Sequence, residues 1–205
     1  MRSENPLNYM FGKLFKKKNS KSPADLYLEH LDRVFGKEPE FFKGESLQNG
    51  IPAVSTIIYR DHPEKGMVTG VTYGLSLVRH PNWKLGRPEL MITVGSEDTS
   101  WAHAAGYVAN KLRGDCPFSY SNTINLGEKI SDGSNMDAFF VFAPSVLTNK
   151  ADYLDIDVGT DYKIHIAGLY PIHASETKFI EKWGLEKFWK HPAYDMYDVN
   201  RRPIV

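Results

Sequence analysis

Five short segments rich in β-branched and aromatic residues constrain the fold of this chain more than any other feature. Such residues pack well on a pleated sheet, and Gly, Pro, Asn and Asp separate the segments, so we predict them to be β-strands. They do not alternate regularly with helices, as a mainly parallel sheet would require, and residues 62–66 form a short hairpin loop between the first two. We therefore predict an α+β fold with a mostly antiparallel sheet packed with helices. The predicted strands are Val54–Tyr59, Met67–Tyr73, Glu89–Val94, Ala138–Phe142 and Ile164–Leu169.

Three helices are predicted from apolar residues at helical spacing. The first follows Ser22, a good N-cap, and stops at Gly36, which suits a helix C-terminus. The second covers about Trp101–Arg113 with Ser100 before it, and its apolar stripe is expected to lie on the sheet. The third covers about Glu176–Lys190 and is expected to break at Gly184.

Length and composition indicate one domain. A chain of 205 residues with 41% hydrophobic residues can bury a continuous core without disulfides, so we assign residues 22–205 to a single domain. Residues 1–21 are rich in Asn, Ser and Lys, and we predict a flexible basic tail there. The sequence contains no apolar run long enough for a signal peptide or a membrane span.

Charge and cysteine content narrow the class of partner. Lys plus Arg and Asp plus Glu both number 25, so the zero net charge gives no general attraction to nucleic acid or to an anionic membrane. The single cysteine, Cys116, excludes an intramolecular disulfide and is compatible with a reducing cytosol. We therefore expect a cytoplasmic protein whose partner is recognised locally.

Motifs for catalysis or metal binding are weak. Cys116 follows the second predicted helix and His103 lies within it, but a buried thiol is the more common role for such a cysteine. The carboxylates in residues 155–161 are spaced like part of a calcium loop but lack the distal glutamate. No phosphate-binding loop, nucleophile elbow or paired-histidine zinc motif is present. We predict no cofactor, no metal site and no enzyme activity, with a cysteine-dependent hydrolase as the alternative.

A series of short motifs resembles bacterial suppressor-of-fused-like domains. The likeness extends over about residues 24–202, and several motifs in the same order are more specific than any single one. They are Thr72–Ser76, His80–Trp83, Gly86–Leu90, Trp101–Ala104, Leu112–Phe118, Val141–Pro144, Gly168–Ile172 and Tyr197–Arg201.

This resemblance implies an α+β protein-interaction domain without catalytic machinery. Bacterial domains of this kind are assigned to toxin systems as immunity proteins, and a longer animal relative restrains a transcription factor by clasping an extended peptide with the help of a second domain. The resemblance also implies that Tyr107 and Asn122 border the peptide groove. The longer relative has an acidic residue where this chain has neutral Asn122, so the same ligand is not implied.

Residues 80–90 supply the other candidates for partner binding. Trp83 offers an aromatic anchor, and Arg87 and Glu89 stand two apart in a predicted strand, where they share one face and can meet charged groups on a partner. Mutual or cross-strand pairing of Arg87 and Glu89, and burial of Trp83, are the structural alternatives.

The sequence thus favours a non-enzymatic protein-binding module, expected to be a bacterial immunity protein that neutralises a toxin. The partner is expected to be a protein, either a toxin or an extended peptide. An intracellular regulatory adaptor is a further alternative.

Overall fold

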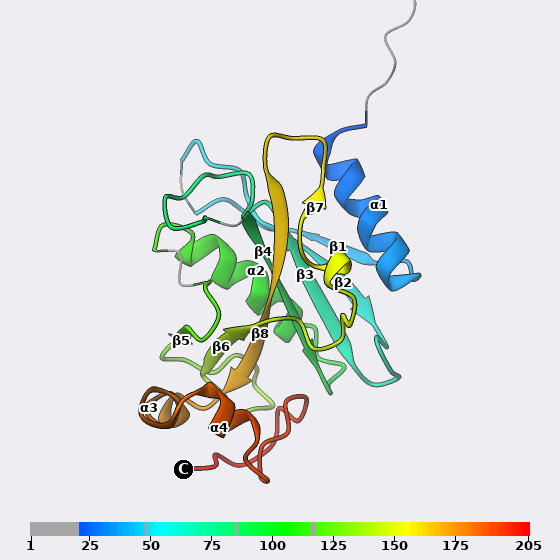
Figure 1. Cartoon of the computed structure of the whole chain (residues 1–205). Helices are drawn as coiled ribbons and strands as arrows, with labels where there is room; N and C mark the ends of the chain where they lie inside the picture. Colours follow the sequence, from blue (N-terminus) through cyan, green and yellow to red (C-terminus); the bar gives the residue numbers. More distant parts are fainter. Residues whose placement is uncertain (1–20, 48, 85, 116–117) are drawn as a thin grey trace, which may run out of the picture.

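A computed structural model describes residues 21–205 except 48, 85, 116 and 117 (Figure 1). The predicted tail, apart from Lys21, therefore lies outside the described residues, as does Cys116. The elements in chain order are α1 (Pro23–Phe35), β1 (Glu40–Lys43), β2 (Ser55–Arg60), β3 (Val68–Tyr73), β4 (Arg87–Val94), α2 (Ser100–Leu112), β5 (Thr123–Asn125), β6 (Ala138–Phe142), the 3-10 turn η3 (Lys150–Asp152), β7 (Ile156–Asp157), β8 (Lys163–Ile172), α3 (Ala174–Trp183) and α4 (Leu185–Trp189).

The strands form one open, eight-stranded sheet, which confirms the predicted α+β class. Its order is β1-β2-β3-β4-β8-β6-β5, and β7 pairs with one end of β8. All neighbours are antiparallel except β4 and β8, which run parallel. All five predicted strands are present, whereas β1, β5 and β7, the three shortest, were not predicted.

The helix ends follow local chemistry. The Ser22 hydroxyl accepts a hydrogen bond from the Asp25 N–H at 3.2 Å, and the Ser22 N–H donates to the Asp25 carboxylate at 2.9 Å, which closes a capping box. Gly36 ends α1 with a left-handed φ of 58°. The second helix begins at Ser100 itself, where the Asp98 carboxylate accepts a hydrogen bond from the Ser100 N–H at 2.9 Å.

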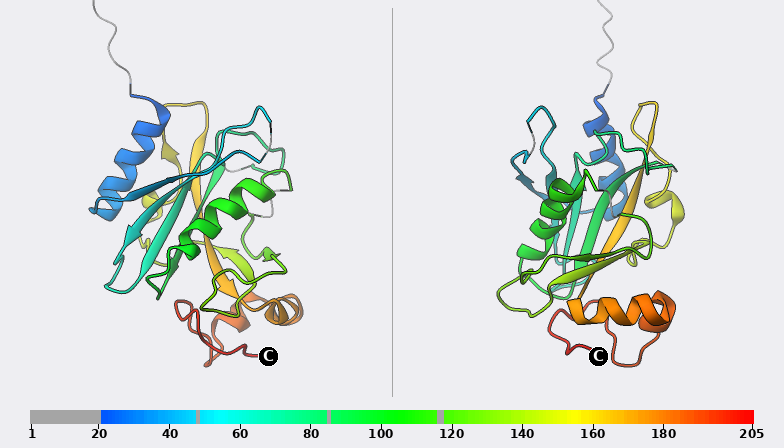
Figure 2. Two further views of the ribbon diagram at one scale, coloured as in Figure 1. Left: turned by 180° about the vertical axis from the view of Figure 1, so that it is seen from behind. Right: turned by 90° about the vertical axis from the view of Figure 1, so that its left-hand side faces the viewer.

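Helices cover both faces of the sheet (Figure 2). Helix α2 lies across one face and packs on side chains from β2, β3, β4, β6 and β8. On the opposite face α1 covers one end of the sheet, with Tyr27 and Leu31 fully buried, and α3 with α4 covers the other end through Phe188. No helix in the described part of the chain combines the length and the apolar character needed to cross a bilayer.

The C-terminal segment is tied to α3 by a buried ion pair. The Arg201 guanidinium donates to both oxygens of Glu176, at 2.6 and 2.8 Å, and the two side chains are 4% and 0% exposed. The Ile204 N–H and the His173 N–H donate to the same carboxylate. Burial alone raises the pKa of Glu176, but the hydrogen bonds from Arg201 and the two N–H groups outweigh it and hold the pKa below its usual value.

Close packing of α2 on the sheet depends on Gly70 in β3. A Cβ atom at this position would lie 2.6 Å from the Ala102 Cβ and 2.7 Å from the Ala102 Cα, far inside van der Waals contact. Only glycine therefore lets the helix backbone approach the strand this closely.

We expect Gly70→Ala to lower the free energy of unfolding by about 1–3 kcal/mol, because the helix must shift away from the sheet. Gly133→Ala is the matched control, since a Cβ there meets its nearest neighbour, the Ser131 Oγ, at an ordinary 3.8 Å. Urea denaturation of both variants measures the difference. Equal stability of the two variants would contradict the packing described above.

Candidate functional site

The residues expected to bind a partner fall into two separate regions. Trp83, Arg87 and Glu89 lie at or just before the start of β4, in the middle of the sheet. Tyr107 lies on α2, and Asn122 directly precedes β5, the strand at one edge. The structure therefore does not bring the five residues together as one surface.

The expectation that Glu89 lies on an exposed face is wrong. Its side chain is 0% exposed. Strand β4 lies between β3 and β8 under layers on both faces, so alternation along β4 does not give it a solvated side. A polar side chain at such a position needs hydrogen-bond partners from the protein itself.

Glu89 obtains these partners from the end of β3 and from the chain that follows it. Its Oε1 accepts from the Ser76 hydroxyl at 2.6 Å, the Gly74 N–H at 2.9 Å and the Ser76 N–H at 3.0 Å. Its Oε2 accepts from the Thr72 hydroxyl at 2.6 Å. Burial raises the pKa of Glu89, although all four hydrogen bonds act to lower it. Glu89 is therefore an internal anchor for residues 72–76.

Arg87 joins the same anchor. Its guanidinium donates to the Ser76 carbonyl at 3.0 Å and lies 3.7 Å from the centre of the Tyr162 ring. Arg87 and Glu89 thus act near each other, as their spacing suggests, but through Ser76 and not through a mutual ion pair. Both side chains already have structural partners, so a direct role of Arg87 in partner binding stays a prediction.

Trp83 is half-buried and packs against the core under α2. Its ring lies 5.6 Å from that of His80, whose Nε2 is 3.0 Å from the Gly114 carbonyl at the end of α2. The aromatic anchor predicted for a partner therefore already serves to hold the loop before β4 against the domain. Binding through its remaining exposed part stays a prediction.

Tyr107 projects from α2, and Asn122 directly precedes the edge strand β5. Tyr107 is 41% exposed, and its hydroxyl accepts a hydrogen bond from Lys111 at 2.8 Å. This hydrogen bond raises the pKa of Lys111, and the Glu128 carboxylate adds to the shift. Asn122 is half-buried, and its side-chain oxygen accepts from the Ser119 N–H at 3.0 Å, which closes the turn before β5.

The outer side of β5 is the accessible feature of this region. The Val141 N–H donates to the Asn122 carbonyl, and the Leu126 N–H donates to the Asp137 carbonyl, so even-numbered residues of this segment direct their backbone groups toward β6. In an antiparallel ladder the residues between them point the opposite way. The N–H and C=O groups of Thr123 and Asn125 therefore face outward, at the end of the strand order. Such an edge is a template for an added strand.

Sequence reasoning missed this strand because it has only three residues and no alternation long enough to detect. It also missed the exposure of Phe142 and Trp183, at 38% and 50%, near the same edge. Apolar spacing alone assigned both residues to a strand or to a helix face. The run of aromatic residues between Phe179 and Trp189 was the available signal.

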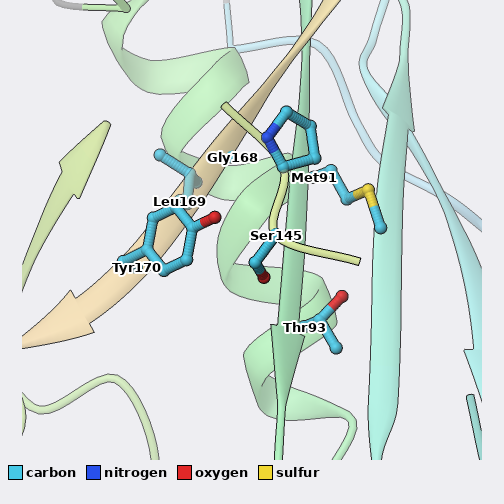
Figure 3. A pocket seen from close by; sticks show the side chains of 7 residues that line it. Met91, Thr93, Ser145, Gly168, Leu169 and Tyr170 are labelled. Atoms are coloured by element: carbon cyan, nitrogen blue, oxygen red, sulfur yellow. The ribbon is translucent and has the colours of Figure 1, made fainter. Parts of the chain in front are cut away.

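A small internal pocket does not offer a substrate site. It lies between β4, β8 and the segment that contains Ser145, and Thr93 and Tyr170 are among the residues that line it (Figure 3). Its volume of about 10 Å³ approaches that of one water molecule. The Tyr170 hydroxyl donates to the Ala143 carbonyl at 2.6 Å and thereby holds the covering segment in place.

The other groups considered for chemistry have local partners. Asp157 pairs with Lys163 at 2.6 Å, and Asp155 lies 3.0 Å from the His165 ring nitrogen. His103 packs its ring against Phe42, with 4.3 Å between the ring centres. Within the described residues, no three His, Asp, Glu or Cys side chains form a group that could hold a metal ion. The thiol–imidazole pair is not described, because Cys116 lies outside those residues.

The fold and the site together define a single α+β domain with an open, mostly antiparallel sheet. The chain belongs to the suppressor of fused protein (SUFU) family, whose family model matches residues 50–202. A search of the curated proteins gave no significant match.

Solved structures share this fold. A putative SUFU homolog from Neisseria gonorrhoeae superposes with a TM-score of 0.67 at 19% identity, covering 88% of this chain and 95% of that one. A chain of a Sufu–Fu complex gives a TM-score of 0.65 at 13% identity, covering 90% and 93%. Drosophila Suppressor of Fused gives 0.62 at 13% identity over 86% of this chain, and this chain spans 49% of that protein.

We expect the Glu89 carboxylate to give stability a distinctive pH dependence. Its pKa is raised in the folded state, so the protonated form is favoured by folding. The associated stability is fully present below the unfolded pKa of 4.5 and is lost as the pH rises through the folded value. Glu89→Gln removes this titration. The unfolding free energy of the parent, relative to that of Glu89→Gln, should therefore be highest at about pH 4 and lower at about pH 8.

Urea denaturation across this range measures the difference in unfolding free energy. Glu64→Gln, on the exposed β2–β3 loop, serves as the matched control. A difference between parent and Glu89→Gln that does not change with pH would show that Glu89 ionises equally easily in both states.

Proposed function

We propose that this protein is a non-enzymatic protein-binding module that captures an extended segment of a partner at the outer edge of β5. The observation that carries the proposal is the edge itself, where Thr123 and Asn125 direct backbone donors and acceptors outward. Main-chain hydrogen bonds to an added strand would supply affinity, and neighbouring side chains would supply selectivity. Half-buried Asn122, directly before β5, and exposed Tyr107, on α2, are the proposed contacts.

Membership of the SUFU family supports a protein partner. One structural relative was solved as a Sufu–Fu complex, so a domain of this fold does assemble with another protein. This chain spans 49% of the Drosophila protein, and the β5 edge lies within the part that the two share in fold. We propose strand addition to this edge as the mode of capture.

The finer proposal is that the partner is a bacterial toxin and that the protein acts in the cytoplasm as an immunity protein. It rests on the likeness to bacterial SUFU domains and on the neutral overall charge, which favours local recognition. An intracellular regulatory adaptor would use the same edge. In that case the partner would be a regulated protein of the same cell instead of a toxin.

Substitutions at Thr123 test the edge. The outward N–H of Thr123 is absent in Thr123→Pro, whereas Thr123→Val keeps both the N–H and the β-branched shape. Random 12-residue peptides displayed on phage provide the probe and are selected on the immobilised parent. We expect Thr123→Pro to weaken the selected peptides by on the order of tenfold or more, and Thr123→Val to bind like the parent.

Thermal unfolding of both variants controls for folding. Peptides that bind Thr123→Pro as well as they bind the parent, or a library from which no peptide is enriched, would exclude capture at β5. The same two variants test the immunity proposal when a toxin gene neighbours this gene. Thr123→Val should then protect a bacterial host that expresses the toxin, and Thr123→Pro should not.

Cys116→Ser tests the hydrolase alternative. We expect this variant to keep the parent's thermal midpoint and peptide affinity, because a binding module needs no nucleophile. Turnover of a panel of chromogenic esters and peptides is measured for both proteins. Hydrolysis by the parent that disappears in folded Cys116→Ser would favour the enzyme and contradict the binding-only proposal.

A further inference from the structure

An aromatic groove lies next to the β5 edge, on the sheet face opposite α2. Its volume is about 530 Å³, and it lies where β6 meets the α3–α4 pair at the lower end of the molecule (Figure 1). This volume is large enough for one side chain of a bound peptide together with its neighbouring residues. The residues that form it include Ser121, Phe142, Trp183, Leu185, Trp189 and Lys190.

The groove walls are held rigidly from beneath. Trp189 packs against the buried Phe140 and Tyr170 rings, at 5.7 and 5.1 Å between centres, and so cannot turn freely. Gly184 separates α3 from α4 with a φ of 84°, a conformation that allows α4 to turn back onto the sheet. An ordered groove captures a side chain with little loss of conformational entropy.

The groove nevertheless exposes large aromatic surface. Trp183 is 50% exposed, Tyr120 45% and Phe142 38%. Phe142 and Trp183 line the groove. The Phe142 ring also contacts the Tyr120 and Trp189 rings, with 5.3 and 5.8 Å between the ring centres. Exposed rings that form a cluster mark an interaction site, whereas single exposed rings do not.

Positive charge surrounds the exposed tryptophan. The Lys187 and Lys182 ammonium groups lie 4.2 and 4.9 Å from the centre of the Trp183 ring. Across the described chain neither lysine lies within ion-pair distance of a carboxylate, whereas Lys190 is paired with Glu186. The Glu186 carboxylate also lines the groove, but Lys190 pairs with it. Two cations without a carboxylate partner therefore remain beside the aromatic walls, and they complement an acidic segment that carries a bulky apolar side chain.

The groove is continuous with the β5 edge. Ser121 lines it and stands two residues before Thr123, the first residue of β5. A strand advances about 3.3 Å per residue, so a segment paired with Thr123 and Asn125 reaches the groove within two or three residues. Backbone pairing and side-chain insertion can therefore be made by one peptide.

We propose that this groove is the specificity pocket for the segment that adds to β5, and that it selects a bulky apolar side chain flanked by acidic residues. The inference rests on the proposed function, because the groove takes its ligand from the same segment. The lysines of the α3–α4 pair attract and orient the acidic flanks, and the Trp183, Phe142 and Trp189 rings enclose the apolar side chain.

The peptides selected on the parent provide the test. Their sequences should share a bulky apolar residue with Asp or Glu within about three positions of it. Trp183→Ala should weaken them by on the order of tenfold or more, because an exposed anchor is removed. The double variant Lys182→Glu/Lys187→Glu should weaken them by a similar factor and reverse the salt dependence. Lys43→Glu/Lys65→Glu, with the same change in net charge at exposed positions outside the groove, should bind like the parent.

Each other result has a defined meaning when the variants keep the parent's thermal midpoint. Binding that is sensitive to Thr123→Pro but not to the groove variants would overturn this inference and leave capture at β5 intact. Binding that is indifferent to both, or no enriched peptide, would overturn both. Self-association of the parent that Trp183→Ala abolishes, seen by sedimentation, would assign the groove to a contact between copies and overturn the peptide role.

Discussion

The parallel pairing of β4 with β8 is the constraint on which the rest of this structure depends. It joins the N-terminal meander of β1 to β4 with the C-terminal part of the sheet, and it places β8 between β4 and β6. A parallel pair needs a long connection, and residues 95–162 provide it. This connection contains α2, β5 and β6. The crossover that joins β4 to β8 therefore also forms one edge of the sheet.

Two buried carboxylates stabilise the loops that this topology leaves long. Glu89 gathers residues 72–76 through four hydrogen bonds, and Glu176 holds Arg201 and the C-terminal segment through a bidentate ion pair. Removal of either carboxylate would leave several buried donors without partners, which costs more than one hydrogen bond contributes. Several residues of the motifs that resemble the SUFU family therefore serve the architecture, and the recognition surface that we propose lies elsewhere.

The recognition surface that we propose follows from where the sheet ends. Strand β5 is short and last in the order, so its outer side forms the edge of the sheet. Helix α2 lies on one face beside this edge, and the α3–α4 pair lies on the opposite face. The aromatic groove forms because α4 turns back at Gly184 and buries Phe188 while Trp183 remains outside. The edge proposed for backbone pairing and the groove proposed for side-chain selection are thus neighbours, although their residues come from distant parts of the sequence.

The sequence by itself determined the local elements and the family. Ser22 and Gly36 bound α1, Gly184 separates α3 from α4, and the five longer strands all appear, because capping, left-handed glycine and β-branched runs act over a few residues. Only the tertiary structure decided the burial of Glu89, the existence of β5 and the exposure of Trp183. The first two depend on which strands become neighbours, because a strand in the middle of a sheet and one at its edge differ in exposure to solvent. The exposure of Trp183 depends on how α4 turns back at Gly184.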